Sequence, residues 1–389
     1  MDFIQEDKKY LFQNYGRFPI SFERGEGVYL YDKEGKKYID MLAGIAVNSL
    51  GYNHPKLTEA ICQQAKKIIH ISNLFYIEPQ IEVAKKLVEN SIKDGKVFFC
   101  NSGAEANETA IKLVRKYFYD KGLNKYEIIS FKNSFHGRTL ASLTATGQPK
   151  YQEGFAPLPE GFKYAELNNI NSVKELITDK TAGIFIEIIQ GEGGINPVEK
   201  DFIEELYKLT RENDILLIID EVQTGIGRTG KPFAYQYYNI EPDIITSAKG
   251  LGGGVPIGAV IARDEIAKSF TAGTHGSTFG GNYLSTVSAK IVLEEIFNKD
   301  RLNKINEAGN YLKTLLEELG FNVRGKGLML GIQLPENIKN LDVMKKSLEN
   351  GLIVGIAGNN TIRFTPPLII SKPEIKEAID IFKSVLKEF

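Results

Sequence analysis

The feature that most constrains the fold is a regular alternation of short apolar runs with amphipathic segments through the middle of the chain. The run Lys96–Cys100 leads into Ala104–Phe118, where apolar residues recur at helical spacing. Further apolar runs typical of strands occur at Glu127–Phe131, Ala182–Ile189, Ile215–Ile219 and Val255–Ala262. Strands that alternate with helices predict a largely parallel central sheet covered by helices.

The two ends of the chain follow a different pattern. Gly27–Tyr38 is typical of two short strands around a turn, and after about residue 290 long helices alternate with short strands. A length of 389 residues fits two domains better than one. We therefore predict an α/β fold with a large domain at 51–289 and a smaller α+β domain built from 1–50 and 290–389.

The composition argues against several classes of protein. Lys and Arg total 48 against 49 Asp and Glu, so there is no basic excess for binding a nucleic acid. No run approaches the roughly 18 apolar residues of a membrane span, and the first residues lack the apolar core of a signal peptide. Two cysteines do not indicate a disulfide scaffold, and four widely spaced histidines give no metal-binding pattern. We expect a cytoplasmic enzyme without a metal.

One glycine-rich segment, Gly225–Pro232 (GIGRTGKP), contains the spacing of two nucleotide-binding motifs. A phosphate loop needs Ser or Thr after its lysine, but here Pro232 follows. A dinucleotide fingerprint should follow its strand at once and open a helix, but Asp220–Thr224 intervene. The segment therefore leaves a dinucleotide-dependent oxidoreductase as a minor alternative.

A first candidate site follows the strand-like run that ends at Cys100. The sequence Asn101–Ala104 leads directly into a helix, whose first backbone N–H groups and positive dipole end suit a phosphate. The alternative is plain helix capping, because Ser102 and Glu105 also fit a capping box.

Two further candidates follow later strands. Asp220 ends a run of five apolar residues, and a carboxylate placed there needs a cation or hydrogen-bond donors. A protonated ring nitrogen would meet that need, and so would a structural ion pair. Lys249 precedes a glycine-rich turn that lets the backbone approach a ligand, and a lysine of lowered pKa forms an imine with an aldehyde. An ordinary solvated lysine is the alternative.

A phosphate site, a carboxylate for a pyridinium nitrogen and an imine-forming lysine are together what pyridoxal phosphate requires. At this point the chain resembles the class-III, fold-type-I pyridoxal-phosphate aminotransferases, from about Asn14 to Pro367. The resemblance lies in the motifs NYGRFPISFERGEGVYLYD, NSGAEAN, FHGRT, QGEGG, DEVQTGIGRTG, SAKGLGGGVPIGA, GSTFGGN and RFTPPL. One departure is Ile188–Ile189, where the family often has Pro-Val.

The resemblance implies pyridoxal 5′-phosphate as the cofactor and assigns residues to it. Lys249 would be the Schiff-base lysine, Asp220 the partner of the ring nitrogen and Gln223 the partner of the phenolic oxygen. The residues implied around the phosphate and the ring face are Ser102, Gly103, Ala104 and Phe135, with Ser277 and Thr278 supplied by a neighbouring subunit. The family pattern thus implies a homodimer with its sites at the interface.

The same resemblance implies the substrates. Arg138 and Arg363 fit the two carboxylates of glutamate or 2-oxoglutarate, because arginine binds carboxylates bidentately. Glu192 resembles the family glutamate that pairs with the second arginine, and Tyr15 matches a tyrosine near the carboxylate of the amino donor.

The remaining choice concerns the amino donor. Within the class, the GSTFGGN segment and the short N-terminus favour N-acetylornithine, a donor of arginine biosynthesis, over 4-aminobutyrate. Ornithine and acyl-lysine or succinyldiaminopimelate donors remain alternatives. An isomerase or decarboxylase on the same fold is disfavoured by the paired arginines, because such enzymes have no second substrate.

Overall fold

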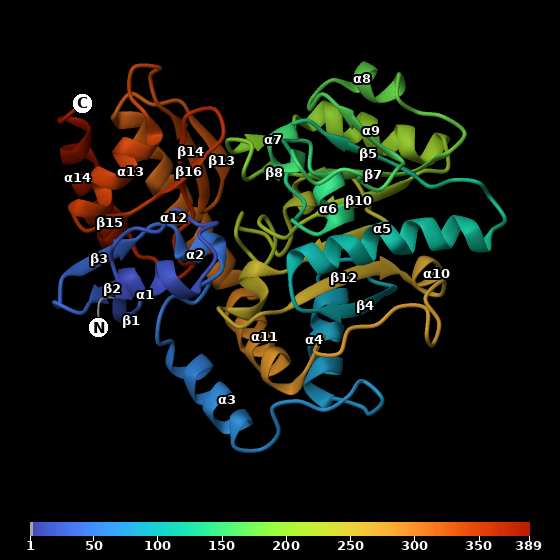
Figure 1. Cartoon of the computed structure of the whole chain (residues 1–389), viewed down its shortest axis with the longest axis horizontal. Coiled ribbons are helices and arrows are strands. Elements are labelled where there is room, and N and C mark those ends of the chain that lie inside the picture. The colour runs from blue at the N-terminus through green and yellow to red at the C-terminus, as the bar shows by residue number, and fades with distance from the viewer. Residues whose placement is uncertain (1–2) are drawn as a thin grey trace.

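The computed structural model describes residues 3–389, and its largest sheet has seven strands within that range (Figure 1). Neighbouring strands are parallel except β12, which runs antiparallel to both of its neighbours. In spatial order the strands are β4 (Gly95–Cys100), β12 (Gly258–Arg263), β11 (Ile244–Ser247), β10 (Leu216–Asp220), β7 (Thr181–Glu187), β5 (Glu127–Phe131) and β6 (Phe162–Ala165). The predicted, largely parallel sheet is therefore present, and all the predicted central strands belong to it.

Helices cover this sheet because alternate strand residues supply apolar side chains to both faces. Ile218 packs with α5 in one buried cluster, whereas its neighbours Leu217 and Ile219 belong to a larger cluster on the other face. The helices of this part of the chain are α3 (Pro55–Ala65), α4 (Glu78–Glu89), α5 (Gly103–Asp120), α6 (Leu140–Ala145), α7 (Pro149–Gln152), α8 (Ile170–Lys174), α9 (Lys200–Glu212), α10 (Asp264–Ala267) and α11 (Tyr283–Ile296), with the 3-10 turns η1 (Ala234–Tyr237) and η2 (Lys249–Gly252).

The N-terminal and C-terminal segments lie side by side, blue beside red in Figure 1. Strand β15 of the C-terminal part pairs in parallel with β3 of the N-terminal part. This pairing supports the proposed smaller domain, whose boundaries stay a prediction. The strands are β1 (Phe22–Glu26), β2 (Tyr29–Asp32), β3 (Lys37–Asp40) and β15 (Leu352–Ile353) in one sheet, and β13 (Val323–Lys326), β14 (Met329–Gln333), β17 (Thr361–Phe364) and β16 (Gly355–Ala357) in another.

The remaining elements complete the two regions. A short hairpin of β8 (Ile189–Gln190) and β9 (Asn196–Pro197) follows β7. The remaining helices are α1 (Phe3–Tyr10), α2 (Ala43–Ala46), α12 (Lys299–Glu318), α13 (Asn340–Glu349) and α14 (Lys372–Leu386). Across residues 3–389, none of the helices combines the length and the apolar character needed to cross a bilayer.

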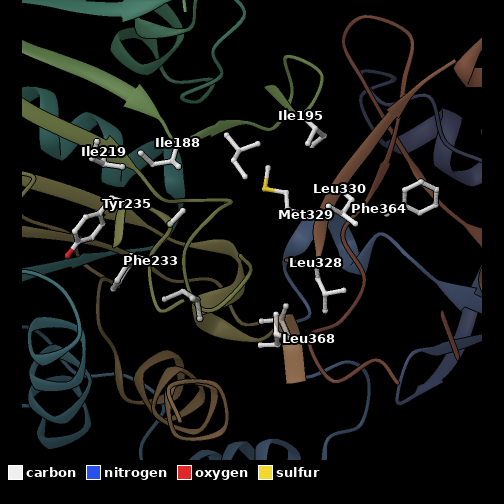
Figure 2. Close-up of a cluster of buried hydrophobic side chains, with 14 of the residues drawn as sticks. Ile188, Ile195, Ile219, Phe233, Tyr235, Leu328, Met329, Leu330, Phe364 and Leu368 are labelled. Carbon is white, nitrogen blue, oxygen red and sulfur yellow. The ribbon is translucent and has the colours of Figure 1, made fainter. Parts of the chain in front are cut away.

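The larger apolar cluster joins the central sheet to the C-terminal strands. Figure 2 shows it running from Ile188 and Ile219 near the sheet, past Met329, to Leu330 and Phe364 on the C-terminal side. Because one cluster spans both regions, the C-terminal strands are held against the edge of the sheet where β7 and β10 end.

The glycine-rich segment Gly225–Pro232 is part of this junction rather than a nucleotide-binding loop. The buried guanidinium of Arg228 donates from Nη1 to the carbonyl oxygens of Leu328 (3.0 Å) and Pro366 (2.5 Å). Gly230 has φ +92°, and a Cβ there would lie 2.0 Å from Asn306 Oδ1, so glycine is required. The segment is followed by a 3-10 turn and opens no α-helix.

Candidate active site

A cavity of about 390 Å³ lies at the carboxyl ends of β4, β5, β7, β10 and β11. This is the edge at which open α/β sheets bind ligands. Of the residues predicted from the sequence, those in its wall are Ser102, Gly103, Ala104, Phe135, Arg138, Glu192, Asp220, Gln223 and Lys249. Residues from five separate loops therefore meet in one place. The wall also includes Ile189, one of the two residues at which the sequence departs from the Pro-Val that is frequent in the family.

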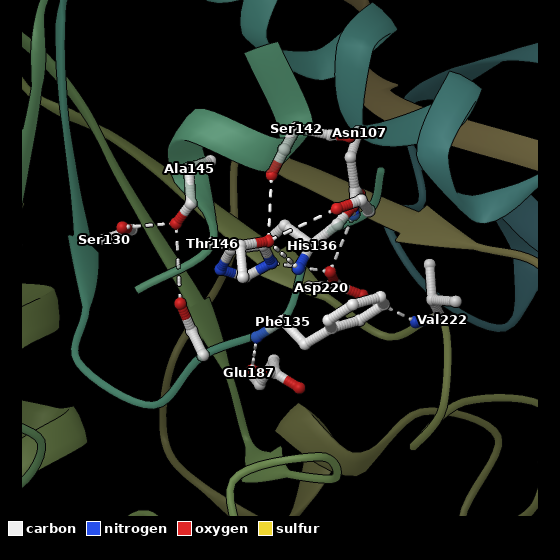
Figure 3. Close-up of polar contacts among 12 residues, drawn as sticks. Asn107, Ser130, Phe135, His136, Ser142, Ala145, Thr146, Glu187, Asp220 and Val222 are labelled. Atoms are coloured by element: carbon white, nitrogen blue, oxygen red, sulfur yellow. Dashed lines mark hydrogen bonds and ion pairs between the residues drawn. The ribbon is translucent and has the colours of Figure 1, made fainter. Parts of the chain in front are cut away.

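Asp220 lies at the end of β10, where the fold holds its carboxylate firmly (Figure 3). Asn107 Nδ2 and His136 Nδ1 both lie 2.8 Å from Oδ2, and Val222 N donates to Oδ1 at 2.9 Å. The ring of His136 stacks on Phe185 with 4.1 Å between the ring centroids. Because Oδ2 of the carboxylate is an acceptor, His136 carries a proton on Nδ1 in this arrangement. Asp220 is fixed in orientation while its side chain still faces the cavity.

Asn107 and His136 are functional residues that the sequence analysis missed. Both occur in the quoted motifs NSGAEAN and FHGRT, so the motifs contain the only available signal. Their contact with Asp220 joins three elements that are remote in sequence.

The start of α5 presents unused donors to the cavity. Ser102 is the N-cap, and its hydroxyl accepts from Glu105 N at 3.2 Å, while Glu105 Oε2 accepts from Asn101 N at 2.8 Å. The N–H groups of Gly103 and Ala104 have no acceptor among residues 3–389. A Cβ at Gly103 would lie 2.7 Å from Val222 Cγ1, so only glycine allows this close approach. The same turn therefore caps the helix and leaves two backbone N–H groups of the kind that bind a phosphate.

Lys249 begins the 3-10 turn η2 immediately after β11 and points into the cavity wall. Its φ of +37° is a conformation that residues other than glycine rarely adopt, and such strain is common at functional sites. Burial lowers the pKa of the Lys249 ammonium, and the positive charge of Arg363 lowers it further. The carboxylate of Glu192 acts in the opposite direction and raises this pKa. Lys249 is thus poised to act as a neutral amine.

Arg363, on β17, reaches the cavity through an ion pair. Its Nη1 donates to Glu192 Oε1 at 2.5 Å and to Gln223 Oε1 at 3.2 Å, and its side chain is 3% exposed. Burial would raise the pKa of Glu192, but the charge of Arg363 beside it holds that pKa below the usual value. The predicted pairing of Glu192 with Arg363 is therefore present in this structure.

Arg138 is also part of the cavity wall, and its guanidinium lies against an aromatic ring. Its guanidinium carbon is 4.0 Å from the centroid of Tyr151 and 5.6 Å from that of Phe135. A guanidinium that stacks on an aromatic ring keeps the N–H groups at its own edge free to bind a carboxylate. Tyr151 is a third residue that the sequence analysis missed, since no motif contains it.

Two buried carboxyl groups beside Asp220 hold the surrounding loops. Glu187 accepts from Phe135 N (3.0 Å) and from Gly191 N (3.3 Å), and burial, together with Asp220, raises its pKa. Burial raises the pKa of Glu221 to about 7, although the hydrogen bond that its carboxylate accepts from Thr224 Oγ1 lowers this pKa. Both groups connect backbone segments that carry wall residues, and neither was predicted to do so.

Besides Arg363, which reaches the cavity through Glu192, three predicted residues lie outside the cavity wall of this chain. Tyr15 is 67% exposed, contacts Arg17 and lines a separate hollow formed by residues 3–21. Thr278 is exposed, and Ser277 accepts from Asn101 Nδ2 at 3.2 Å. Asn101 lines the cavity, so the loop of Ser277 and Thr278 borders the cavity without closing it.

The residues present fit pyridoxal phosphate. The unused N–H groups of Gly103 and Ala104 suit its phosphate, the fixed carboxylate of Asp220 suits a protonated ring nitrogen, and Lys249 suits its aldehyde.

Comparison with known proteins gives matches over almost the whole chain. The family model Aminotransferase class-III matches residues 10–386. The acetylornithine aminotransferase of Aquifex aeolicus is 55% identical over 378 residues, which cover 97% of this chain and 100% of that protein. That of Methanocaldococcus jannaschii is 50% identical over 100% of this chain and 98% of its own length.

Solved structures agree in fold. A Bacillus anthracis aminotransferase superposes with a TM-score of 0.93 at 30% identity, covering 100% of this chain and 98% of that one. The N-acetylornithine aminotransferase of Stenotrophomonas maltophilia gives a TM-score of 0.85 at 34% identity, covering 99% of each chain. These matches confirm the predicted fold class.

The fold and the site together define an enzyme that transfers amino groups. More particularly, the chain belongs to the class-III aminotransferases, whose cofactor is pyridoxal 5′-phosphate. This assignment takes the place of the dinucleotide alternative raised by the glycine-rich segment.

Proposed function

We propose that this enzyme transfers the terminal amino group of N-acetylornithine to 2-oxoglutarate. The products are N-acetylglutamate semialdehyde and glutamate, and the reaction serves arginine biosynthesis. The observation that carries the proposal is the cavity, which Arg138 lines with its guanidinium against Tyr151 and which Arg363 reaches through its ion pair with the wall residue Glu192. The acetylornithine aminotransferases at 44–55% identity support the choice of donor.

In this proposal the chain's own residues hold the cofactor and move one proton. Gly103 and Ala104 would donate backbone N–H groups to its phosphate, with Ser102 as the cap of that turn, and Phe135 would lie against the ring. When bound, the cofactor supplies an aldehyde that accepts the amine and a ring that takes up the electrons of the broken C–H bond. Lys249 Nζ, a neutral amine, takes the proton from the carbon that bears the reacting nitrogen.

Asp220 keeps the ring nitrogen protonated, because a nearby opposite charge favours the charged form. Asn107 and His136 hold its carboxylate in the required orientation. The amide of Gln223 accepts from Arg363 through its oxygen, so its N–H₂ group is the part that would donate to the phenolic oxygen of the ring, beside the contact that it makes with Glu192.

The ion pair explains how one site accepts two different amines. N-acetylornithine has its carboxylate far from the reacting amine, whereas glutamate also has one next to it. Arg138 is placed for the distant carboxylate of both, and Arg363 for the near one that only glutamate and 2-oxoglutarate possess. A buried, unpaired Arg363 would be costly while N-acetylornithine is bound, so Glu192 neutralises it in that half of the cycle.

The donor is tested by a panel of amines with 2-oxoglutarate as the common acceptor. We expect kcat/KM for N-acetylornithine to exceed that for ornithine and 4-aminobutyrate by at least about tenfold. Ornithine lacks the acyl group, and 4-aminobutyrate also has a shorter distance between its amine and its carboxylate. Glutamate formation measures the rates. A higher kcat/KM for another donor would replace N-acetylornithine and leave the aminotransferase assignment intact.

The ion pair is tested by measuring the two half-reactions separately. In Arg363→Ala we expect the glutamate half to slow by about 100-fold, because a charge-assisted contact is lost, and the N-acetylornithine half by less than about tenfold. In Glu192→Ala we expect the opposite order, because the freed Arg363 favours α-amino acids. Single-turnover absorbance changes with each substrate give the rates. Equal damage to both halves in both variants would exclude this role of the pair.

We further propose that the enzyme is a homodimer in which Ser277 and Thr278 complete the site of the neighbouring subunit. Asn73 Nδ2 donates to the carbonyl oxygens of Ser277 (3.1 Å) and Gly280 (2.9 Å), which ties this loop to the adjoining segment. That segment carries strongly exposed apolar side chains in the single chain, at Leu74, Phe75 and Tyr76. A contiguous apolar surface of this kind is typical of an interface.

Tyr15 is proposed to contact the donor carboxylate, a role that would require the N-terminal segment to approach a cavity.

A cytoplasmic location is proposed because Cys62 and Cys100 are both unpaired, as expected in a reducing compartment.

A further inference from the structure

A second, larger cavity lies between the glycine-rich segment, α12 and the turn that joins β13 to β14. Its volume is about 700 Å³, and its wall includes Lys231, Lys299, Lys313 and Lys326. No Asp or Glu is part of this wall in the described chain. We name it the lysine cavity after these four residues.

The positive charge of the lysine cavity is largely uncompensated. Within residues 3–389, Lys231, Lys299 and Lys326 form no ion pair, and only Lys313 has a carboxylate nearby, that of Glu317 at 3.7 Å. The ammonium groups of Lys231 and Lys326 lie 4.6 and 4.1 Å from the centroid of the same ring, that of Tyr237. They are therefore close enough to repel each other within about 10 Å, the screening length at moderate salt.

Neutral donors extend this pattern along one face of α12. Asn303, Asn306 and Asn310 recur at helical spacing between Lys299 and Lys313, and all of them face the lysine cavity. Asn306 Nδ2 already donates to the carbonyl oxygens of Gly230 and Leu302, both at 3.0 Å, so Asn303 and Asn310 supply the amides that remain for a ligand. The wall thus combines ammonium and amide donors, which together recognise an anion with several acceptor oxygens.

We propose that the lysine cavity binds a small phosphorylated metabolite at a site separate from the active site. Lysine binds phosphate as a point charge, whereas bidentate carboxylate sites favour arginine, and no arginine lines this cavity. The volume is in the range of small-molecule sites and exceeds the needs of one phosphate group. Phe297, Leu302 and Leu330 give an apolar wall for the organic part of the ligand.

The walls of the lysine cavity come from both regions of the chain. Gly230–Tyr237 follows the central strand β10, whereas α12 and the β13–β14 turn belong to the C-terminal part. A ligand held by both walls stabilises their contact, so binding raises the unfolding temperature of the protein. The proposal does not depend on which amino donor the enzyme uses.

The test uses pyrophosphate as the probe and the cofactor-loaded enzyme as the protein. Calorimetric titration at low ionic strength should show saturable binding, together with a rise in unfolding temperature. In Lys299→Gln/Lys326→Gln, where both side chains are exposed and form no ion pair within residues 3–389, the affinity should fall at least about tenfold, because two charge-assisted contacts are lost. Lys231→Gln, in the glycine-rich segment, provides a second variant and should also weaken binding.

The matched control is Lys304→Gln/Lys345→Gln, which removes the same charge from exposed positions outside the wall. Its affinity should change by less than about twofold, since only long-range electrostatics are altered. Citrate should bind more weakly than pyrophosphate, and equal or tighter citrate binding would overturn the phosphate class. Absence of pyrophosphate binding, or unchanged affinity in the lysine-cavity variants, would overturn the site itself.

Discussion

Replacement of Lys249 by alanine is expected to lower turnover by roughly 10⁴, the largest loss for any single side chain of this enzyme. In the proposed mechanism, Lys249 both links to the cofactor aldehyde and carries the substrate proton. Its buried position, which lowers the pKa of the ammonium, serves both tasks because each requires the neutral amine. Steady-state glutamate formation measures the loss.

Two further measurements separate this role from a loss of charge. Lys249→Arg keeps the positive charge but cannot give up its proton, so it should be as inactive as the alanine variant. Borohydride reduction of the native enzyme should attach the cofactor to the peptide that contains Lys249. Attachment at a different lysine, or substantial turnover in Lys249→Arg, would remove Lys249 from the mechanism.

Asp220→Asn is expected to retain the cofactor and to lose activity by a factor on the order of 10² or more. An amide has nearly the shape of the carboxylate but no charge, so it cannot keep the ring nitrogen protonated. The rate of the first half-reaction, followed by absorbance, measures the effect. Asn107→Ala serves as a control that removes one hydrogen-bond donor and leaves the carboxylate, and its loss should be smaller. Near-normal turnover in Asp220→Asn would contradict the proposed role.

The sequence was sufficient to predict the residues that lie at strand ends. Asp220 ends an apolar run, whereas Lys249 was predicted from the glycine-rich turn that follows it, and the sheet brings both residues to the edge where its parallel strands end. Two short strands of the same sheet, β6 and β11, were not predicted. With four residues each, they are too short to show a periodic pattern.

The supporting contacts could not be predicted in the same way. The bond from Asn107 to Asp220 joins residues 113 positions apart, and no local pattern specifies such a pair. Tyr151, beneath Arg138, depends on the path of the chain between β5 and β6. Tyr15 and Thr278 lie outside the cavity of one chain, so their proposed roles depend on an assembly that a single chain does not contain.

The pairing of β3 with β15 has a consequence for how the chain acquires its structure during synthesis. The two strands are separated by roughly 300 residues, so at about 5–20 residues per second β3 waits on the order of 15–60 s for its partner. During that interval one edge of β3 remains open, and its apolar residues Tyr38 and Ile39 lack the C-terminal strand that later buries them. The ribosome must therefore synthesise nearly the whole chain before the sheet that contains β3 is complete.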